Sequence, residues 1–129
     1  MSGKVVHFEV PFGDGARARE FYQQAFGWNV VEMPELDYTI VSTGPAAESG
    51  MPAEPGYIGG GMFERSADSP QGPVITVDVA DIDAALAKIE SLGGQTIQAK
   101  QPVGEMGFAA YFKDTEGNIM GLWELAAPS

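Results

Sequence analysis

The amino-acid sequence predicts an α+β fold made of two tandem β-α-β-β-β modules. A strand-like alternation opens each half of the chain, one amphipathic helix follows it, and the halves end on the similar stretches "GMFE" (61–64) and "GLWE" (121–124). Such self-similarity indicates one architecture used twice. With 129 residues, 44% of them hydrophobic, we expect a single domain over 1–129, with module one at about 4–64 and module two at about 73–126.

Module one begins with the strand "VVHFEV" (5–10), in which apolar side chains alternate with others. Asp14 is the expected N-cap of a helix that stops at Gly27, and its apolar residues recur with helical spacing. We expect Phe21, Tyr22 and Phe26 to pack in the core. Three strands should follow, "WNVVEM", "DYTIVS" and "YIGGGMFE", with a surface loop at 44–56 before the last.

Module two repeats this order with the strand "VITVDV" (74–79) and a helix capped by Asp81 and ended by Gly93 and Gly94. The strands "QTIQA", "FAAYF" and "NIMGLWEL" complete it. In both opening strands one face is apolar, and we expect it to pack on the helices. Its residues are Val6, Phe8 and Val10 in module one and Ile75, Val77 and Val79 in module two.

Charge and composition exclude several functions. Seven Lys and Arg residues against 18 Asp and Glu residues give a formal net charge of -11. Nucleic acid and anionic membranes would be repelled, so neither is an expected partner. The chain has no cysteine, which excludes disulfides and thiolate chemistry. The N-terminal residues contain no long apolar stretch, so we expect a cytoplasmic protein.

Aligning the two halves also pairs individual residues. "VHFEV" matches "ITVDV", which sets His7 over Thr76 and Glu9 over Asp78. The strand endings set Gly61 over Gly121, Phe63 over Trp123 and Glu64 over Glu124. A glycine inside a strand marks a bulge or the close approach of another group. Both strands therefore raise the question of what lies against the glycine.

Three segments resemble the vicinal oxygen chelate superfamily, which includes glyoxalase I, extradiol dioxygenases and bleomycin-resistance proteins. They are "AREFYQQAFGW" (18–28), "VADIDAALAKIESLGG" (79–94) and "FKDTEGNIMGLWE" (112–124), and they are most similar to small bacterial glyoxalase-related members. The resemblance implies that the strands of each module curl into a half-barrel sheet and that the two sheets surround a cleft. It also implies a homodimer.

Metal-dependent members of this superfamily take ligands from the first and fifth strands, usually His or Gln, and from the fourth and eighth, usually Glu. The resemblance places these positions at His7, Val74, Gly61 and Gly121. Only the first is a normal metal ligand, so no cofactor is expected. The alternative is a divalent metal such as Zn, Ni or Fe held by His7, Glu64 and Glu124. Both glutamates have the opposite strand parity from the glycines, so this site would need a bulge in each strand.

The sequence thus favours a small-molecule-binding protein that lacks the full metal ligand set. The residues expected to bind the ligand are His7, Glu9, Tyr38, Gly61, Phe63, Thr76, Asp78, Tyr111, Gly121 and Trp123. One alternative is a metal-dependent, glyoxalase-like lyase or isomerase, or a dioxygenase-related enzyme. Another is a metal-free enzyme with His7 or Glu9 as the acid or base, since a histidine titrates near neutral pH. His7 as a merely packed core histidine is equally open.

Overall fold

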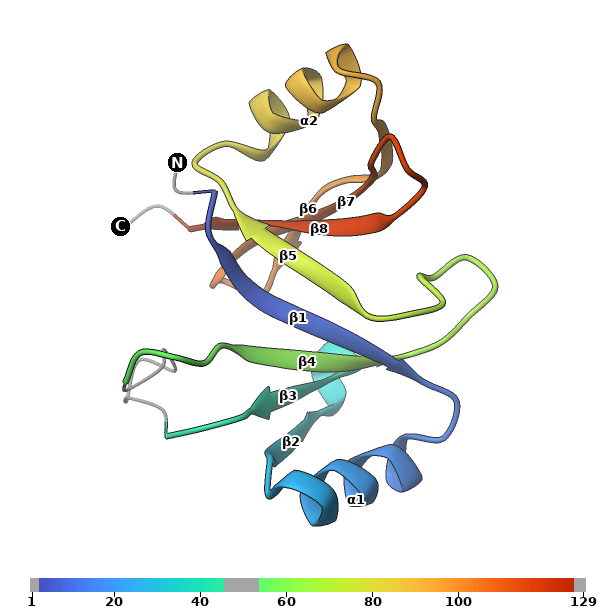
Figure 1. The fold of residues 1–129 in the computed structure, drawn as a ribbon, viewed down its shortest axis with the longest axis vertical. Coiled ribbons are helices and arrows are strands. Elements are labelled where there is room, and N and C mark those ends of the chain that lie inside the picture. The colour runs from blue at the N-terminus through green and yellow to red at the C-terminus, as the bar shows by residue number, and fades with distance from the viewer. Residues whose placement is uncertain (1–2, 46–53, 127–129) are drawn as a thin grey trace. The chain divides into compact units, whose positions relative to one another are not determined.

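The computed structural model describes residues 3–45 and 54–126. They form two compact units, of which one is His7–Pro73 and the other joins Met1–Val6 to Val74–Ser129. The boundary between the units therefore lies inside the first strand. The α+β fold with two tandem βαβββ modules is confirmed (Figure 1). The predicted loop at 44–56 lies mostly outside the described residues.

The first module contains four strands, one α-helix and one short 3₁₀ helix. Their bounds are β1 (Val5–Phe12), α1 (Gly15–Phe26), β2 (Asn29–Met33), η1 (Pro34–Leu36), β3 (Tyr38–Ser42) and β4 (Gly59–Glu64). The strand order is β2-β3-β4-β1, in which β1 runs parallel to β4 and the other neighbours are antiparallel.

The second module repeats this plan without the 3₁₀ helix. Its elements are β5 (Val74–Asp78), α2 (Ile82–Ser91), β6 (Gln95–Val103), β7 (Gly107–Lys113) and β8 (Ile119–Leu125). The order β5-β8-β7-β6 again has one parallel pair, β5 with β8. Strand β6 is longer than predicted and includes Pro102. Strand β6 is an edge strand, because it pairs only with β7 in this order. An edge strand tolerates proline where its backbone N–H would have no partner strand.

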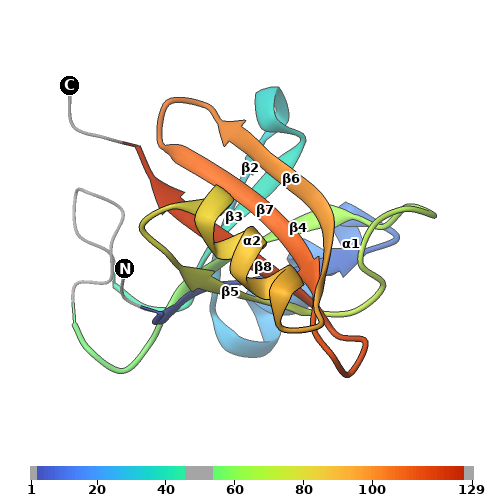
Figure 2. The same ribbon diagram turned by 90° about the horizontal axis from the view of Figure 1, so that it is seen from above.

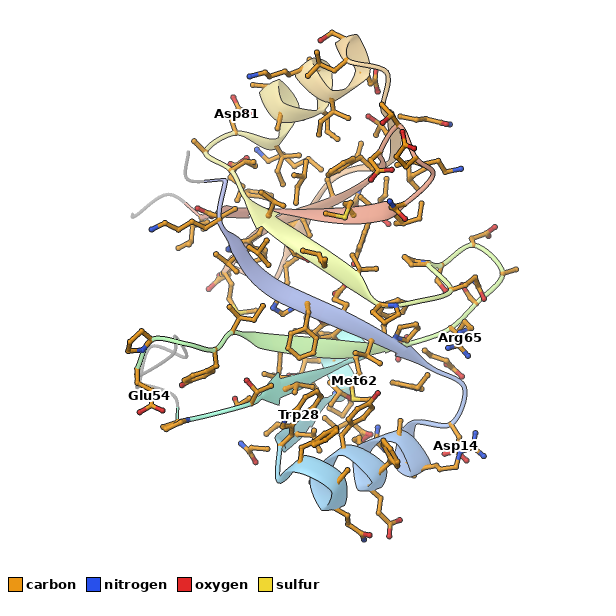
Figure 3. All side chains as sticks on the ribbon, in the orientation of Figure 1. Asp14, Trp28, Glu54, Met62, Arg65 and Asp81 are labelled. Carbon is orange, nitrogen blue, oxygen red and sulfur yellow. The ribbon has the colours of Figure 1, made fainter. Side chains whose placement is uncertain are left out.

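Both helices begin at the predicted caps (Figure 3). The Asp14 carboxylate accepts a hydrogen bond from the backbone N–H of Arg17, and Asp81 does the same for Ala84. Helix α1 ends at Gly27, whose φ of 72° is in the left-handed region that glycine adopts without strain. None of the helices among the described residues has the length and apolar character needed to span a membrane.

The helices differ in how well they are covered. Helix α2 lies over its own sheet (Figure 2) and buries Ile82, Ala85 and Leu86 in a cluster with Ala110 and Leu122. Helix α1 has no buried residue. The interior of its module instead includes Val41, Met62 and Thr39, from the strands.

The prediction that Phe21, Tyr22 and Phe26 lie in the core is therefore wrong. Phe21 is 59% exposed and Phe26 is 64% exposed. These rings pack on one another and on Trp28, whose ring stacks on Tyr22 at 4.9 Å between centroids. Helical spacing predicts which face of a helix is apolar, but not how much of that face the sheet covers.

The predicted inward face of β5 is also wrong in part. Ile75 is 47% exposed, whereas Val74 and Thr76 on the opposite face are 1% and 7% exposed. Val79 is buried against α2 as expected. Alternation along a strand separates two faces but does not say which is covered when both carry apolar residues.

Candidate functional site

In module one, four residues from the two strands that flank β4 meet around Gly61. Glu9 of β1 and Ile40 of β3 are its direct partners in the ladder. His7 stands two residues before Glu9 and so shares its face of the sheet. Tyr38 stands two residues before Ile40 and lies on that face too. The left-handed backbone of Asp37, at φ 52°, turns the chain from η1 into β3 directly before this tyrosine.

The side chain that lies against Gly61 is Tyr38. A Cβ placed on Gly61 would overlap the hydroxyl group and the ring of Tyr38. The missing side chain therefore provides the space in which the tyrosine ring lies. This is the close approach that a glycine inside a strand indicates.

The Tyr38 hydroxyl joins His7 to Glu9. It donates a hydrogen bond to Oε2 of Glu9 at 2.7 Å and lies 2.8 Å from Nε2 of His7. A hydroxyl has one hydrogen, so a tyrosine that donates to the carboxylate must accept from the imidazole. His7 therefore carries a hydrogen on Nε2. We call His7, Tyr38 and Glu9 the polar triad.

The triad is largely withdrawn from solvent. Glu9 is 7% exposed, and His7 is partly buried. Burial lowers the pKa of His7, because it disfavours the charged imidazolium, and the nearby Glu9 carboxylate acts in the opposite direction. Burial is the larger effect, so the neutral imidazole is favoured at neutral pH. A buried carboxylate needs hydrogen-bond donors, and the tyrosine supplies one.

Module two builds a smaller arrangement around Gly121. Its partners in the ladder are Thr76 of β5 and Tyr111 of β7. A Cβ on Gly121 would come within 2.7 Å of the Thr76 hydroxyl oxygen. The threonine side chain thus takes the space that the tyrosine ring takes in module one. A hydroxyl group lies against the glycine in both modules.

The expected pairing of the two opening strands is wrong by two residues. Gly61 faces Glu9 and Gly121 faces Thr76, so Glu9 corresponds to Thr76, and His7 corresponds to Val74. A shift of two residues keeps every side chain on its face, so the alternation alone could not detect it. The resemblance placed the two positions at His7 and Val74, which agrees with the observed register.

The other residues expected at the site lie nearby within their own modules. Phe63 is two residues after Gly61 on the same strand face and is partly buried. Asp78 pairs with Trp123 in the ladder, and the Trp123 ring covers Gly107, whose Cβ would come within 2.7 Å of it. The structure thus groups the polar triad with Gly61 and Phe63, and groups Thr76, Tyr111, Gly121 and Trp123 separately.

Glu64 and Glu124, the alternative metal ligands, lie on the other faces of their strands. Neither ladder contains a bulge beside the glycines, so both glutamates keep the opposite parity. Glu64 is exposed. Among residues 3–45 and 54–126, no three His, Asp or Glu side chains are grouped as metal ligands would be.

The Glu124 side chain links β8 to α2 and β6 through hydrogen bonds and an ion pair. Its Oε1 accepts a hydrogen bond from the backbone N–H of Ile82 at 2.8 Å, and its Oε2 lies 3.2 Å from Nζ of Lys100. The carboxylate thus lies at the N-terminus of α2, where a negative charge is favourable. The contact between Lys100 and Glu124 could not be predicted, because no sequence pattern indicates that a lysine of β6 lies beside this carboxylate.

Comparison with known proteins agrees with this architecture. Residues 4–44 match the family model described as "Bleomycin resistance protein-like N-terminal". A curated relative from Mycobacterium tuberculosis, named "Putative glyoxylase CFP32", is 27% identical over 120 residues. The match covers 86% of this chain but 41% of the relative, so the chain spans about two-fifths of that protein's length.

Three solved structures show the same fold. Methylmalonyl-CoA epimerase from Mycobacterium tuberculosis has a TM-score of 0.64 at 17% identity, over 96% of this chain and 88% of its own. A variant of the Streptomyces coelicolor methylmalonyl-CoA epimerase, in complex with 2-nitronate-propionyl-CoA, has a TM-score of 0.65 at 18% identity, over 98% and 100%. A hypothetical protein from Bacillus halodurans has a TM-score of 0.63 at 15% identity, over 98% and 96%.

The solved structures show that the chain has the fold expected from its resemblance to the vicinal oxygen chelate proteins. The family model and the curated relative agree with that resemblance.

Proposed function

We propose that the protein binds a small molecule through the polar triad of module one, without a metal ion. The observation that carries this proposal is the tyrosine against Gly61. The hydroxyl of Tyr38 lies against the glycine that the resemblance aligns with a metal-binding glutamate, and it bonds to the only histidine of the chain. A partly apolar surface with a few convergent polar groups is typical of a ligand site.

The contacts expected from module one are hydrogen bonds from the triad and apolar contact with Phe63. Within module two, the residues proposed as ligand contacts are the polar Thr76, Asp78 and Tyr111 and the apolar Trp123 near Gly121. The solved neighbour from Streptomyces coelicolor is described in complex with a CoA derivative. Thioesters of CoA therefore belong in the first set of compounds to be screened.

The test is a ligand screen by NMR, with the backbone and His7 imidazole resonances as probes. A matched pair of variants provides the control, because Glu9→Gln and Glu64→Gln make the same change on neighbouring strands but on opposite faces. We expect Glu9→Gln to weaken binding about tenfold or more, since a hydrogen bond to a charged group is lost. Glu64→Gln should bind as the wild type does. Equal effects of both changes would contradict the proposal.

The competing function is a metal-dependent, glyoxalase-like lyase or isomerase, and the curated relative is named a putative glyoxylase. It would require Glu64 and Glu124 to leave their present positions, and Glu124 would have to break its bonds to α2 and Lys100. Elemental analysis of protein purified without chelator or affinity tag separates the two. Stoichiometric zinc, nickel or iron would favour the enzyme and overturn our proposal.

A homodimer is a further part of the proposal, and it rests on the resemblance. Light scattering of the eluting protein measures its molar mass directly. A mass of twice 13.6 kDa is expected. A monomer at all accessible concentrations would contradict it.

A further inference from the structure

We propose that the polar triad selects a weakly acidic ligand, one with an ionisable O–H or N–H such as a phenol, an enol or an imide, and accepts its proton at Nδ1 of His7. This inference rests on the proposed function and names its ligand class. It begins from the hydrogens in the triad, whose arrangement leaves the lone pair of one imidazole nitrogen as an acceptor position for a ligand.

That position is Nδ1. The Nε2 hydrogen of His7 is donated to Tyr38, and the Tyr38 hydrogen is donated to Glu9. A neutral imidazole with a hydrogen on Nε2 has a lone pair on Nδ1. Among the described residues no hydrogen bond to Nδ1 is found, and none of their buried side-chain nitrogens and oxygens lacks a partner. Nδ1 is therefore not fully buried within its module.

The proton transfer is balanced within the site and the ligand. The O–H or N–H bond of the ligand breaks, and an N–H bond forms at Nδ1, so the ligand becomes an anion and His7 becomes an imidazolium. The imidazolium keeps its Nε2 hydrogen bond to Tyr38. The hydroxyl of Tyr38 continues to donate to Glu9, whose negative charge stabilises the new positive charge through the tyrosine.

The groups around His7 favour this step over the binding of a ligand that is already an anion. Glu9 faces His7 from β1 and Tyr38 faces it from β3, whereas β4 contributes Gly59 and Gly61, which carry no side chain. A carboxylic acid has lost its proton at neutral pH and would approach neutral His7 with Glu9 nearby. A weak acid approaches uncharged and ionises only when paired with His7.

Tyr38 acts as a positioning residue for the imidazole of His7. Its ring fills the space left by Gly61, and its hydroxyl fixes both the hydrogen on Nε2 and the orientation of the imidazole. Removal of the hydroxyl would leave Glu9 without this donor and would free the imidazole to exchange its tautomer. Both changes would reduce the basicity that Nδ1 offers to the ligand.

The test uses para-nitrophenol, whose phenolate absorbs visible light, and para-nitroanisole, which has the same shape without the O–H. The pH is set below the phenol's own pKa, so that the free compound keeps its proton. We expect wild-type protein to bind para-nitrophenol about tenfold more tightly than para-nitroanisole, since a charge-assisted hydrogen bond is made only with the phenol. The phenolate absorbance should rise on binding, and the Nδ1 resonance of ¹⁵N-labelled His7 should move to the imidazolium position.

Three variants refine the result. His7→Gln should bind both compounds equally, and Tyr38→Phe should reduce both the preference and the phenolate signal by about fivefold. Glu64→Gln, on the opposite face, should behave as the wild type. The NMR spectrum of each variant shows whether it is folded.

The inference is overturned if wild-type protein binds the two compounds equally or does not bind para-nitrophenol. It is also overturned if the bound phenol stays protonated. In these cases the proposed function still stands if other compounds from the screen bind in a manner that depends on Glu9. If no compound of the screen binds, the proposed function fails as well.

Discussion

The two modules place different side chains against the same glycine. In module one the ring of Tyr38 lies against Gly61 and its hydroxyl bonds to His7 and Glu9, whereas in module two the small Thr76 side chain lies against Gly121. The strand order and the parallel pair are the same in both. The repeated backbone thus leaves the space of one missing side chain at the glycine of each module. The side chain that fills this space comes from a neighbouring strand and differs between the modules.

The two helices also differ, because α2 has buried residues and α1 has none. This contrast predicts the largest change in stability. Ile82→Ala should lower the free energy of unfolding by about 2–5 kcal/mol, since the side chain is 0% exposed and a cavity would remain. Phe21→Ala should cost about 1 kcal/mol or less, because Phe21 is 59% exposed. Urea titration measures both. Equal losses would mean that α1 is covered by something in solution.

The contrast between the glycines predicts the next effect. Gly61→Ala should destabilise the protein by about 1–3 kcal/mol, because the new methyl group must displace the Tyr38 ring. The double variant Gly61→Ala with Tyr38→Ala removes the overlap and should be more stable than the sum of the single changes implies. Additive effects in urea titration would show that the ring does not lie there.

Gly121→Ala should cost less, about 1 kcal/mol. The new Cβ meets mainly the Thr76 hydroxyl, at 2.7 Å, and rotation about one bond moves that hydroxyl away. Thermal unfolding followed by circular dichroism compares this variant with Gly61→Ala directly. A larger loss at Gly121 than at Gly61 would reverse the comparison between the modules.

The smallest effect is a pH dependence that belongs to module one alone. Burial lowers the pKa of His7 in the folded protein, so the unfolded chain takes up the proton first as the pH falls. The contribution of His7 to stability is therefore fully present above about pH 6.5 and is lost as the pH falls through the lowered pKa. His7→Gln should flatten the stability profile below pH 6.5. Identical profiles for the two proteins would show that His7 is not buried.

Much of the fold was predictable, because local signals coincide with the repeat. Asp14 and Asp81 are the caps they were predicted to be, and Gly27 ends its helix in the left-handed region. Burial was less predictable. The exposed Phe21 and Ile75 depend on how much surface another element covers, which no periodicity in the sequence records.

The sequence predicted which residues belong to the candidate site, but not how their side chains are arranged. The sequence named His7, Glu9 and Tyr38, yet it offered no reason for them to bond to one another. The available signal was Gly61, because a glycine inside a strand requires a close neighbour. Identifying that neighbour needs the register of β3 against β4, which depends on the turn at Asp37 and on distant packing.

The position of the boundary between the units within β1 has a consequence for fragments of this protein. Gly3 and Lys4 exchange backbone hydrogen bonds with Asp78, at 2.9 Å each. A proteolytic cut or an engineered break in the linker at 65–73 would separate the two sequence repeats. Residues 3–6 would then stay on the fragment that contains module one, although Gly3 and Lys4 bond to module two. A fragment that begins at Val74 would lack those partners for Asp78. We therefore expect the second repeat to be expressed in folded form only when residues 3–6 are grafted ahead of it or supplied as a peptide.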